Sequence, residues 1–401
     1  MLNTKNNLIE LKKYSTEIYG IDDIKETSPI NKKKLLVKVG FDPTTPDLHL
    51  GHYILIQKMQ HLQKIGHVII FLIGDFTTMI GDPTGRNICR KKITKKEIKD
   101  NYVKYHIIIR KFLDKKKTKI INNSFWLNKL NTEGIIHLAS KTTVAQLLKR
   151  NDFSLRYNNN VAINLHEFLY PLLQGFDSIA LKADVEMGGI DQKFNLLLGR
   201  ELQKIFNQEQ QIIILLPLLI GLDGTNKMSK SLGNHIKLED EPEEIFGKIM
   251  SISDELMWEY CIKLNIYSNN TIKQYRRKNT TLNPKDLKIN LAYSIVKKLH
   301  NTQDAERAKK SFIERFSKKN IPLDLKSYII KCEDETATIP LISALKQLNL
   351  TKSTTESIRL IKQKAIKING KALLDNNISL NKNTTAIVSV GKRIIVKIHI
   401  V

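Results

Sequence analysis

The spacing of apolar and polar positions near the start of the chain predicts a strand, a helix and a second strand. The apolar run "LLVKVGF" (35–41) predicts a buried strand, and "HVIIFLIGDF" (67–76) predicts another. Between them, residues 49–65 place apolar side chains on one helical face and end at Gly66; the face consists of Ile54, Leu55, Met59 and Leu62. Because buried parallel strands read as continuous apolar runs, these segments predict a βαβ unit.

Two further segments extend the same predicted sheet. "ADVEMGG" (183–189) and "QIIILLPLLIGL" (211–222) predict two more strands. Loops rich in glycine, aspartate and threonine follow several strands: "GDFTTMIGDPTGR", "GGIDQ" and "GLDGTNKMSKSLGN". In doubly wound sheets, ligands bind at the carboxyl ends of the strands. Residues 1–235 are therefore predicted to form an α/β, Rossmann-like domain with a doubly wound parallel sheet and a site among these loops.

The pattern changes after residue 235. Residues 236–330 have helical periodicity without strand-like runs and predict a separate α-helical domain. The polar stretch "KCEDETAT" (331–338) predicts a linker. Residues 339–401 predict a small α+β domain, in which a helix leads into a hairpin at Asn369-Gly370 and a strand pair closes the chain.

Composition places few further limits on the protein. The chain has 401 residues, 41% hydrophobic and 26% charged, as in soluble globular proteins. Its apolar runs fall short of the roughly 20 residues that span a bilayer, and its N-terminus does not resemble a secretory signal. Cys89, Cys261 and Cys332 lie too far apart to indicate a disulfide framework or a zinc site. We therefore expect a cytoplasmic protein without a membrane partner.

The net charge of +25, from 65 basic and 40 acidic residues, has two explanations. An excess of this size favours a polyanionic partner such as nucleic acid. Lysine, however, far outnumbers arginine, and asparagine and isoleucine are plentiful. AT-rich codons produce the same composition, with lysines scattered over solvated faces. Charge alone therefore does not establish nucleic-acid binding.

Two histidines, His49 and His52, bracket Gly51 at the start of the predicted helix. A helix N-terminus has unpaired N–H groups and about half a positive charge, so it attracts anions. Two imidazoles on one side can add hydrogen bonds to a phosphate, and Gly51 lets a planar ligand approach the backbone. Ordinary packing and half of a metal site are the alternatives, although no Cys or carboxylate at helical spacing completes such a site.

A second candidate is the loop "GLDGTNKMSKSLGN" (221–234), which carries Lys227 and Lys230 among three glycines. A glycine-hinged loop of this kind can close over a triphosphate and neutralise charge on the leaving pyrophosphate. The alternative is a solvated surface loop of a basic chain. A P-loop ATPase is disfavoured because the motif G-x-x-x-x-G-K-[ST] is absent.

Together, "HLGH" (49–52) and "KMSKS" (227–231) resemble the two signatures of the class I aminoacyl-tRNA synthetases, which jointly hold ATP. "GFDPTTPDLHLGH", "MIGDPTGR", "EFLYPLLQGFDS" and "GGIDQKFN" narrow the resemblance to tyrosyl-tRNA synthetase of the bacterial type, over roughly residues 30–250. The tail, with "STTESIRLIKQKAIKINGKAL", resembles an S4-type RNA-binding module. The resemblance implies a catalytic domain at 1–235, an anticodon-binding helical domain at 236–330 and an S4-like domain at 339–401.

The resemblance also implies roles for the matching residues. Asp177, in an apolar context where a carboxylate needs a partner, would accept the phenolic hydrogen bond of tyrosine. The substrate ammonium would be held by Asp82, Tyr170 and Gln174, and the carboxylate would lie near Gln192. The nucleotide would be bound by Asp42, Thr44, Gly51, Asp191 and Met228, and its phosphates by His49, His52, Lys227, Lys230 and Ser231. Arg86 and Arg90 would approach the pyrophosphate, unless they are only solvated charges.

By the same resemblance, the tyrosine carboxylate attacks the α-phosphate of ATP, pyrophosphate leaves, and the tyrosyl group passes to the terminal adenosine of tRNA(Tyr). Positioning and charge stabilisation would then carry the rate without a protein nucleophile. Mg²⁺ is implied by the triphosphate, with no all-protein metal cage visible in the sequence. A homodimer is implied as well.

Two positions depart from the family pattern. Some members have a second phenol-binding tyrosine four residues before the Asp of "GFDP", and the residue here is Lys38. Position 186 is Glu where those members have Gln. Because the Lys38 ammonium cannot accept a hydrogen bond, either it points away from the substrate or the phenol is recognised differently.

Three rival functions remain open at this stage. A tryptophanyl-tRNA synthetase shares the fold and both signatures, but Asp177 and the S4-like tail argue against it. A small-molecule nucleotidyltransferase of the HxGH type would not need an RNA-binding tail. A non-catalytic RNA-binding protein would not need intact His49, His52, Lys227 and Lys230.

Overall fold

The computed structural model describes residues 9–21, 34–83, 93–267, 271–272, 283–316, 326–330, 338–373, 375, 378–391 and 394–401. The chain divides into two compact units, Met1–Lys309 and Lys310–Val401. Within the described ranges, no helix combines the length and apolar content that crossing a membrane requires.

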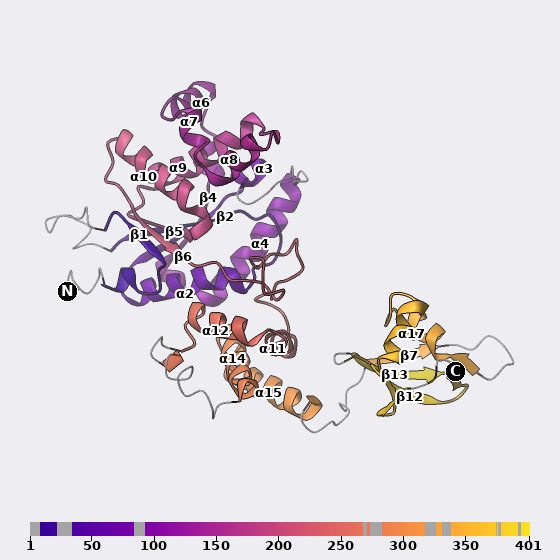
Figure 1. The fold of residues 1–401 in the computed structure, drawn as a ribbon. Coiled ribbons are helices and arrows are strands. Elements are labelled where there is room, and N and C mark those ends of the chain that lie inside the picture. Colours follow the sequence, from indigo (N-terminus) through magenta and orange to yellow (C-terminus); the bar gives the residue numbers. More distant parts are fainter. Residues whose placement is uncertain are drawn as a thin grey trace. The chain divides into compact units, whose positions relative to one another are not determined.

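A six-stranded sheet, in the order β1-β6-β5-β2-β3-β4, forms the centre of the N-terminal unit (Figure 1). Its parallel strands are β2 (Leu36–Phe41), β3 (Val68–Ile73), β4 (Thr118–Asn122), β5 (Val185–Gly189) and β6 (Ile212–Leu216). β1 (Glu17–Tyr19) pairs antiparallel with β6 at the edge. Because the strand order reverses between β2 and β5, the sheet is doubly wound, which confirms the predicted α/β class and places the ligand crevice at that reversal.

The four predicted strands are present as β2, β3, β5 and β6. The apolar pattern did not predict β1 or β4. β1 has only three residues, and four of the five residues of β4 are not buried. Short edge strands that are partly exposed lack the continuous apolar run that identified the central strands.

Helices cover both faces of the sheet (Figure 1). One face carries α2 (Leu50–Lys64), beside α4 (Lys95–Phe112), and the other carries α9 (Leu169–Leu181) and α10 (Lys193–Ile205). α2 confirms the predicted helix, which ends before Gly66 at φ 102°. α9 and α10 approach closely, because a Cβ on Gly175 would lie only 3.2 Å from the Cα of Gly199.

Short elements complete this part of the unit. The helices are α3 (Thr77–Ile80), α5 (Ser124–Leu127), α6 (Thr132–Ala139), α7 (Val144–Leu147) and α8 (Asn151–Asn158). The 3₁₀ turns are η2 (Lys115–Lys117), η3 (Leu165–Phe168) and η4 (Ile190–Gln192).

A helical segment follows the sheet, as predicted for most of 236–330. Its helices are α11 (Pro242–Met250), α12 (Asp254–Lys263), α14 (Pro284–Leu299) and α15 (Thr302–Phe316). α12 is anchored just beyond β6: the Tyr260 hydroxyl donates to the carbonyl of Ile220 at 2.7 Å, and Lys263 Nζ donates to that of Leu218 at 2.7 Å. The helical segment thus supports the entry to the predicted lysine loop.

The C-terminal unit contains a five-stranded sheet in the order β10-β9-β12-β13-β7. The strands are β7 (Lys326–Ile330), β9 (Ile366–Ile368), β10 (Lys371–Ala372), β12 (Thr385–Val390) and β13 (Ile394–Ile400). A separate pair is formed by β8 (Thr338–Pro340) and β11 (Ser379–Asn381), and the helices are α16 (Leu341–Gln347) and α17 (Thr354–Lys362).

Two predictions for this unit are confirmed and one is corrected. The hairpin at Asn369-Gly370 joins β9 and β10, with φ values of 48° and 84° that suit a tight turn. β12 and β13 form the closing pair. The helical prediction is wrong for residues 326–330, which form β7 by parallel pairing with β13. The predicted linker lies outside the described residues except for Thr338, and the predicted domain boundaries stay predictions.

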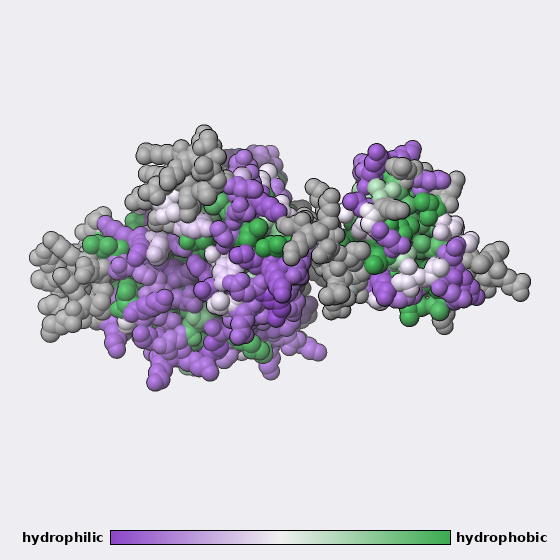
Figure 2. Space-filling view, turned by 90° about the horizontal axis from the view of Figure 1, so that it is seen from below, coloured by the Kyte–Doolittle hydropathy of each residue, from purple (hydrophilic) through white to green (hydrophobic). Residues whose placement is uncertain are grey.

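Hydrophilic residues cover most of the face of the N-terminal unit that Figure 2 shows, with small hydrophobic spots between them. The unit's apolar residues concentrate inside, and β2, β3, β5 and β6 supply fully buried side chains.

Candidate active site

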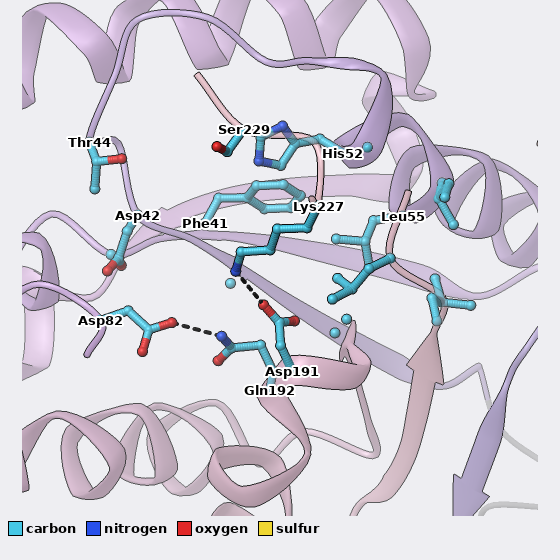
Figure 3. A pocket seen from close by; sticks show the side chains of 18 of the residues that line it. Phe41, Asp42, Thr44, His52, Leu55, Asp82, Asp191, Gln192, Lys227 and Ser229 are labelled. Atoms are coloured by element: carbon cyan, nitrogen blue, oxygen red, sulfur yellow. Dashed lines mark hydrogen bonds and ion pairs between the residues drawn. The ribbon is translucent and has the colours of Figure 1, made fainter. Parts of the chain in front are cut away.

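A cavity of about 650 Å³ lies in the N-terminal unit at the carboxyl ends of the sheet strands (Figure 3). Most of the residues predicted for the site line it: Asp42, Thr44, His49, Gly51, His52, Asp82, Tyr170, Gln174, Asp177, Asp191, Gln192, Lys227, Met228, Lys230 and Ser231. Arg86 and Arg90 lie outside the described residues. The fold therefore brings together segments that are up to about 190 residues apart in sequence.

The two histidines cap α2 reciprocally. His49 is the N-cap residue, and its Nδ1 accepts the backbone N–H of Gly51 at 3.2 Å. In return, His52 Nδ1 accepts the backbone N–H of His49 at 3.1 Å. These bonds satisfy two of the unpaired donors at the helix start, in the manner of a capping box.

The capping bonds also define what the histidines can offer a ligand. An Nδ1 that accepts a hydrogen bond carries no proton, so a neutral ring bears its proton on Nε2 and can donate from there. Burial lowers the pKa of His52 to about 4 and, together with the charge of His52, lowers the pKa of His49 well below its ordinary value. Both rings are therefore neutral donors near pH 7, and they can bond a phosphate without competing with the lysines for countercharge.

Gly51 has a packing reason besides ligand access. A Cβ at this position would lie 3.0 Å from both Nδ1 and Cε1 of His49. A side chain would therefore press against the imidazole that caps the helix. Glycine lets that ring fold back over the first turn.

The lysine loop lies opposite the histidines. Lys227 Nζ pairs with Asp191 Oδ2 at 3.2 Å, as Figure 3 shows. Lys230 Nζ lies 3.1 Å from Asp47 Oδ2, and Asp47 also pairs with Lys237. Burial lowers the pKa of Lys230, and Asp47 offsets part of this effect. Both signature lysines thus hold carboxylates that a triphosphate could replace as their partners.

Asn234 holds the loop in shape from inside. Its Nδ2 donates to Asp223 Oδ2 at 2.9 Å and to the carbonyl of Lys227 at 3.2 Å, and its Oδ1 accepts the N–H of Ser229 at 2.8 Å. A Cβ on Gly221 would lie 2.2 Å from Asn234 Nδ2, so glycine is needed there. Side-chain hydrogen bonds from Asn226 and Asn234 lower the pKa of Asp223 to about 2, which keeps it an ionised acceptor.

The loop's far end is bonded to the start of α2. The N–H of Leu50 donates to the carbonyl of Ile236 at 2.8 Å, and that of Leu238 donates to Leu48 at 2.9 Å. Between these bonds, His49 and Lys237 face each other in an antiparallel bridge. The two signatures are therefore held together through the backbone.

Comparisons with known proteins agree with this geometry. The family model for class I tRNA synthetases (W and Y) matches residues 31–317. The tyrosine–tRNA ligase of Legionella pneumophila strain Paris is 48% identical over 387 residues, covering 95% of this chain and 96% of that protein. The tyrosine–tRNA ligase of Coxiella burnetii is 44% identical and covers both chains fully.

The chain belongs to the class I tRNA synthetase family.

Solved structures show the same fold as this synthetase chain. A tyrosyl-tRNA synthetase from Archaeoglobus fulgidus, solved with L-tyrosine, aligns with a TM-score of 0.62 at 24% identity, covering 76% of this chain and 99% of that one. A truncated mitochondrial tyrosyl-tRNA synthetase from Aspergillus nidulans aligns with a TM-score of 0.64 at 20% identity. The alignment covers 79% of this chain and 95% of that one.

Asp177 lies at the inner end of the synthetase cavity and is only 2% exposed. Its Oδ1 accepts the indole N–H of Trp126 at 2.8 Å, and its Oδ2 accepts from Asn123 Nδ2 at 3.3 Å. Both carboxylate oxygens therefore have hydrogen-bond partners inside the protein. Burial raises the pKa of Asp177 to about 7, although the charge of Lys38 opposes the rise.

A polar network links the other residues predicted to hold the amino acid. Asp82 accepts from Gln192 Nε2 at 2.7 Å, as Figure 3 shows, and from Arg150 Nη2 at 3.2 Å. Asn195 Nδ2 donates to Gln192 and to Gln174, at 3.0 Å each. Arg150 and Asn195 thereby fix the orientation of these side chains.

Tyr170 and Asp42 meet at the boundary of the two predicted subsites. The Tyr170 hydroxyl donates to Asp42 Oδ2 at 3.0 Å, while Thr77 Oγ1 donates to Asp42 Oδ1 at 2.9 Å. Burial and the Asp42 charge raise the pKa of Tyr170 well above its ordinary value, so it stays a hydroxyl donor. A Cβ on Gly74 would lie 2.0 Å from Asp42 Oδ1, which explains the glycine after β3.

Lys38 and Glu186 make contact with each other. Lys38 Nζ pairs with Glu186 Oε1 at 2.9 Å, and the two residues are register partners on β2 and β5. The two departures from the family pattern thus form one buried ion pair. Of the alternatives for Lys38, the structure supports a side chain engaged with the protein beneath the cavity.

Sequence reasoning missed the residues that orient this site: Asn123, Trp126, Arg150, Asn195 and Asn234. Asn195 is the last residue of the motif "GGIDQKFN", and Asn234 is the last residue of "GLDGTNKMSKSLGN". Their place in these motifs could have predicted that they belong to the site. Asn123, Trp126 and Arg150 lie outside every quoted motif, and only the packing of their helices brings them to the cavity.

We expect the raised pKa of Asp177 to appear in the pH dependence of stability. Between about pH 4 and 7 the native carboxyl holds a proton that the unfolded chain releases, so this group's contribution falls as pH rises through that window. Asp177→Asn removes the effect. Urea unfolding of both proteins should show the stability of the wild type falling by roughly 2 kcal/mol more than that of the variant between about pH 5 and pH 8. Parallel pH profiles would contradict the raised pKa.

Proposed function

We propose that this synthetase chain joins L-tyrosine to tRNA(Tyr), using ATP as the co-substrate. The observation that carries this proposal is the buried Asp177 carboxylate at the inner end of a cavity that both ATP signatures also line. A buried acceptor in this place suits a phenolic hydroxyl, which tryptophan and phenylalanine lack. The curated relatives bear the name tyrosine–tRNA ligase.

Each predicted side chain has a task in this reaction. Asp82, Tyr170 and Gln174 bind the substrate ammonium, and Asp177 accepts the phenolic hydrogen bond. Asp191 holds the ribose, Gln192 lies near the amino-acid carboxylate, and Asp42, Thr44, Gly51 and Met228 line the nucleotide site. The carboxylate attacks the α-phosphate, and pyrophosphate leaves toward His49, His52, Lys227, Lys230 and Ser231.

The neutral imidazoles and the charged lysines contribute differently to the binding of the phosphates. The histidines donate from Nε2 at a fixed position, because their rings are held by the capping bonds. The lysines supply the positive charge that stabilises the developing pyrophosphate. The tyrosyl group then passes to the 2′-hydroxyl of the terminal adenosine of tRNA, with the C-terminal unit and the basic chain contributing RNA contacts.

Magnesium enters with the nucleotide in this proposal. Within the described residues, no cluster of three or more His, Cys, Asp or Glu is arranged to hold a metal ion. Mg²⁺ commonly binds through substrate phosphates and water rather than through a dedicated protein cage. The protein residues therefore act on the phosphates directly.

ATP–pyrophosphate exchange, measured with each amino acid in turn, tests the proposed function. We expect exchange with tyrosine alone, and exchange at background level when Mg²⁺ is omitted. Exchange with tryptophan would support the tryptophanyl rival, and exchange with no amino acid would exclude the synthetase function. Subsequent charging of tRNA(Tyr) distinguishes the ligase from a small-molecule nucleotidyltransferase.

Lys230→Ala should slow adenylate formation by about 10²–10³-fold, since the transition state loses a charge donor. Tyrosine binding, measured by equilibrium dialysis without ATP, should change by less than about twofold because Lys230 lies on the phosphate side. Lys237→Ala, which removes the other lysine paired with Asp47, is the matched control. A parallel loss of tyrosine affinity in Lys230→Ala would make the lysine structural.

We propose that the chain works as a homodimer. Several large apolar side chains between residues 125 and 165 are exposed, led by Leu165 at 82% and Phe125 at 68%. Exposed apolar groups of this kind mark interaction surfaces, and a second copy is the commonest partner for such a surface. Leu165→Glu should convert the dimer to a monomer in analytical ultracentrifugation, while Ile107→Glu, at an exposed position on α4, should leave it intact. A wild type that sediments as a monomer would refute the proposal.

A further inference from the structure

A buried ion pair lies beneath the part of the cavity that holds Asp177. Lys38 and Glu186 are 0% and 1% exposed, and both also line the cavity. They stand opposite each other on β2 and β5, where the strand order of the sheet reverses. The pair therefore occupies the point where the doubly wound fold places its ligand crevice.

Every hydrogen-bonding position of the Lys38 ammonium is used. Its Nζ pairs with Glu186 Oε1 at 2.9 Å and donates to Ser178 Oγ at 2.7 Å and to the carbonyl of Gln174 at 2.9 Å. Glu186 Oε2 accepts from Ser178 Oγ at 2.8 Å and from Gln211 Nε2 at 2.6 Å. A buried charge pair is tolerable only when its partners are satisfied in this way.

These bonds fasten α9 to the sheet. Gln174 and Ser178 are one turn apart on α9, and Asp177 lies on the same turn. Gly199 of α10 leaves room for the network, since a Cβ there would lie 3.2 Å from Gln211 Nε2 and 3.5 Å from Glu186 Oε2. The ammonium of Lys38 thus links β2 directly to the helix turn that carries Asp177.

We propose that Lys38 and Glu186 act as one positioning pair that fixes where α9 presents Asp177, and so determine the preference for a phenolic over a plain aromatic substrate. The proposal rests on the proposed function, in which Asp177 accepts the phenolic hydrogen bond. Neither residue of the pair is catalytic. The positive charge of Lys38 and the negative charge of Glu186 balance each other. Lys38 lowers the pKa of Asp177, and Glu186 raises it.

The groups that face Asp177 from each neighbouring element support this assignment. Trp126, on α5, and Asn123, just before α5, both donate to the Asp177 carboxylate. Burial raises the pKa of Asp177 most strongly, Lys38 on β2 lowers it, and Glu186 on β5 raises it. Tyr170 lies about two turns earlier on α9, where its hydroxyl donates to Asp42. Lys38 is therefore the cation that favours an ionised acceptor for the phenol.

The experiment uses the full chain with Lys38→Met, Glu186→Gln and the double variant. In ATP–pyrophosphate exchange, we expect the double variant to raise the KM for tyrosine about tenfold or more and to lower the tyrosine-to-phenylalanine ratio of kcat/KM by a similar factor. The KM for ATP should stay within about twofold, because the phosphate side of the cavity is untouched. A wild type without tyrosine-dependent exchange would refute the proposed function rather than this inference.

Lys58→Met is the matched control for removing a buried lysine. Lys58 is 2% exposed and donates to the carbonyls of Glu10, Leu11 and Lys13, outside the cavity. Thermal unfolding should show a loss of stability in this control, with an unchanged KM for tyrosine. If the double variant behaves like the control, with KM and the phenylalanine ratio within about twofold of the wild type, the positioning role is refuted.

A second readout does not depend on turnover. The indole N–H of Trp126 donates to Asp177, so its NMR signal should follow the ionisation of that carboxyl, with Trp258 as an internal reference. Relative to the wild type, Lys38→Met should move the titration midpoint to higher pH and Glu186→Gln should move it to lower pH. Loss of structure alone does not predict opposite shifts. Shifts of the same sign, or no shift in either variant, would overturn the inference.

Discussion

The backbone bonds between Leu48–Leu50 and Ile236–Leu238 are the constraint on which the rest of the site depends. They join the first turn of α2 to the exit of the lysine loop, although about 190 residues separate the two in sequence. The same turn is closed by the reciprocal histidine caps. The joined backbone segments therefore fix both the orientation of the imidazole donors and the position of the lysine loop. A ligand gripped between them gains from this preorganisation, because little of the site needs to be ordered on binding.

The lysines of the cavity can exchange their carboxylate partners for phosphate oxygens at a small cost in free energy. Lys227 is about half exposed and holds Asp191, and Lys230 shares Asp47 with Lys237. Partly exposed pairs of this kind contribute little free energy, so phosphate oxygens can displace the carboxylates. The neutral state of His49 and His52 matters for the same reason, since two more cations at this point would repel the lysines. Asp191, once released, becomes available to the ribose hydroxyls proposed as its ligands.

Periodicity in the sequence located β2, α2, β3, β5 and β6 because each buries a continuous apolar surface. It failed for β1, β4 and β7, because most of their residues are not buried and they lack a continuous apolar run. Short motifs were enough to predict many of the residues that line the cavity, because those motifs stand in the segments that surround it. The partners of Asp177 could not, because Trp126 and Asn123 reach it only through the packing of α5 against α9. The sequence showed Lys38 and Glu186 as two separate departures from the family pattern. Only the register of β2 and β5 shows that they form a pair.

The proposed role of the Lys38–Glu186 pair would make recognition of the substrate hydroxyl depend on the sheet. Buried ion pairs are often no more stabilising than apolar side chains of similar volume, so stability alone is a weak reason for placing one at the floor of a cavity. Apolar replacements could fill the space between β2 and β5, but they could not hold the carbonyl of Gln174 or the hydroxyl of Ser178. The contact of α9 with α10 is apolar, with Leu172 and Leu173 of α9 packed beside Leu198 and Leu202 of α10, and apolar contacts have no preferred direction. The hydrogen bonds of Lys38 from the sheet to the turn of Asp177 add the direction that apolar packing does not supply. In the proposed function, the position of one Asp177 oxygen distinguishes a ring with a hydroxyl from one without.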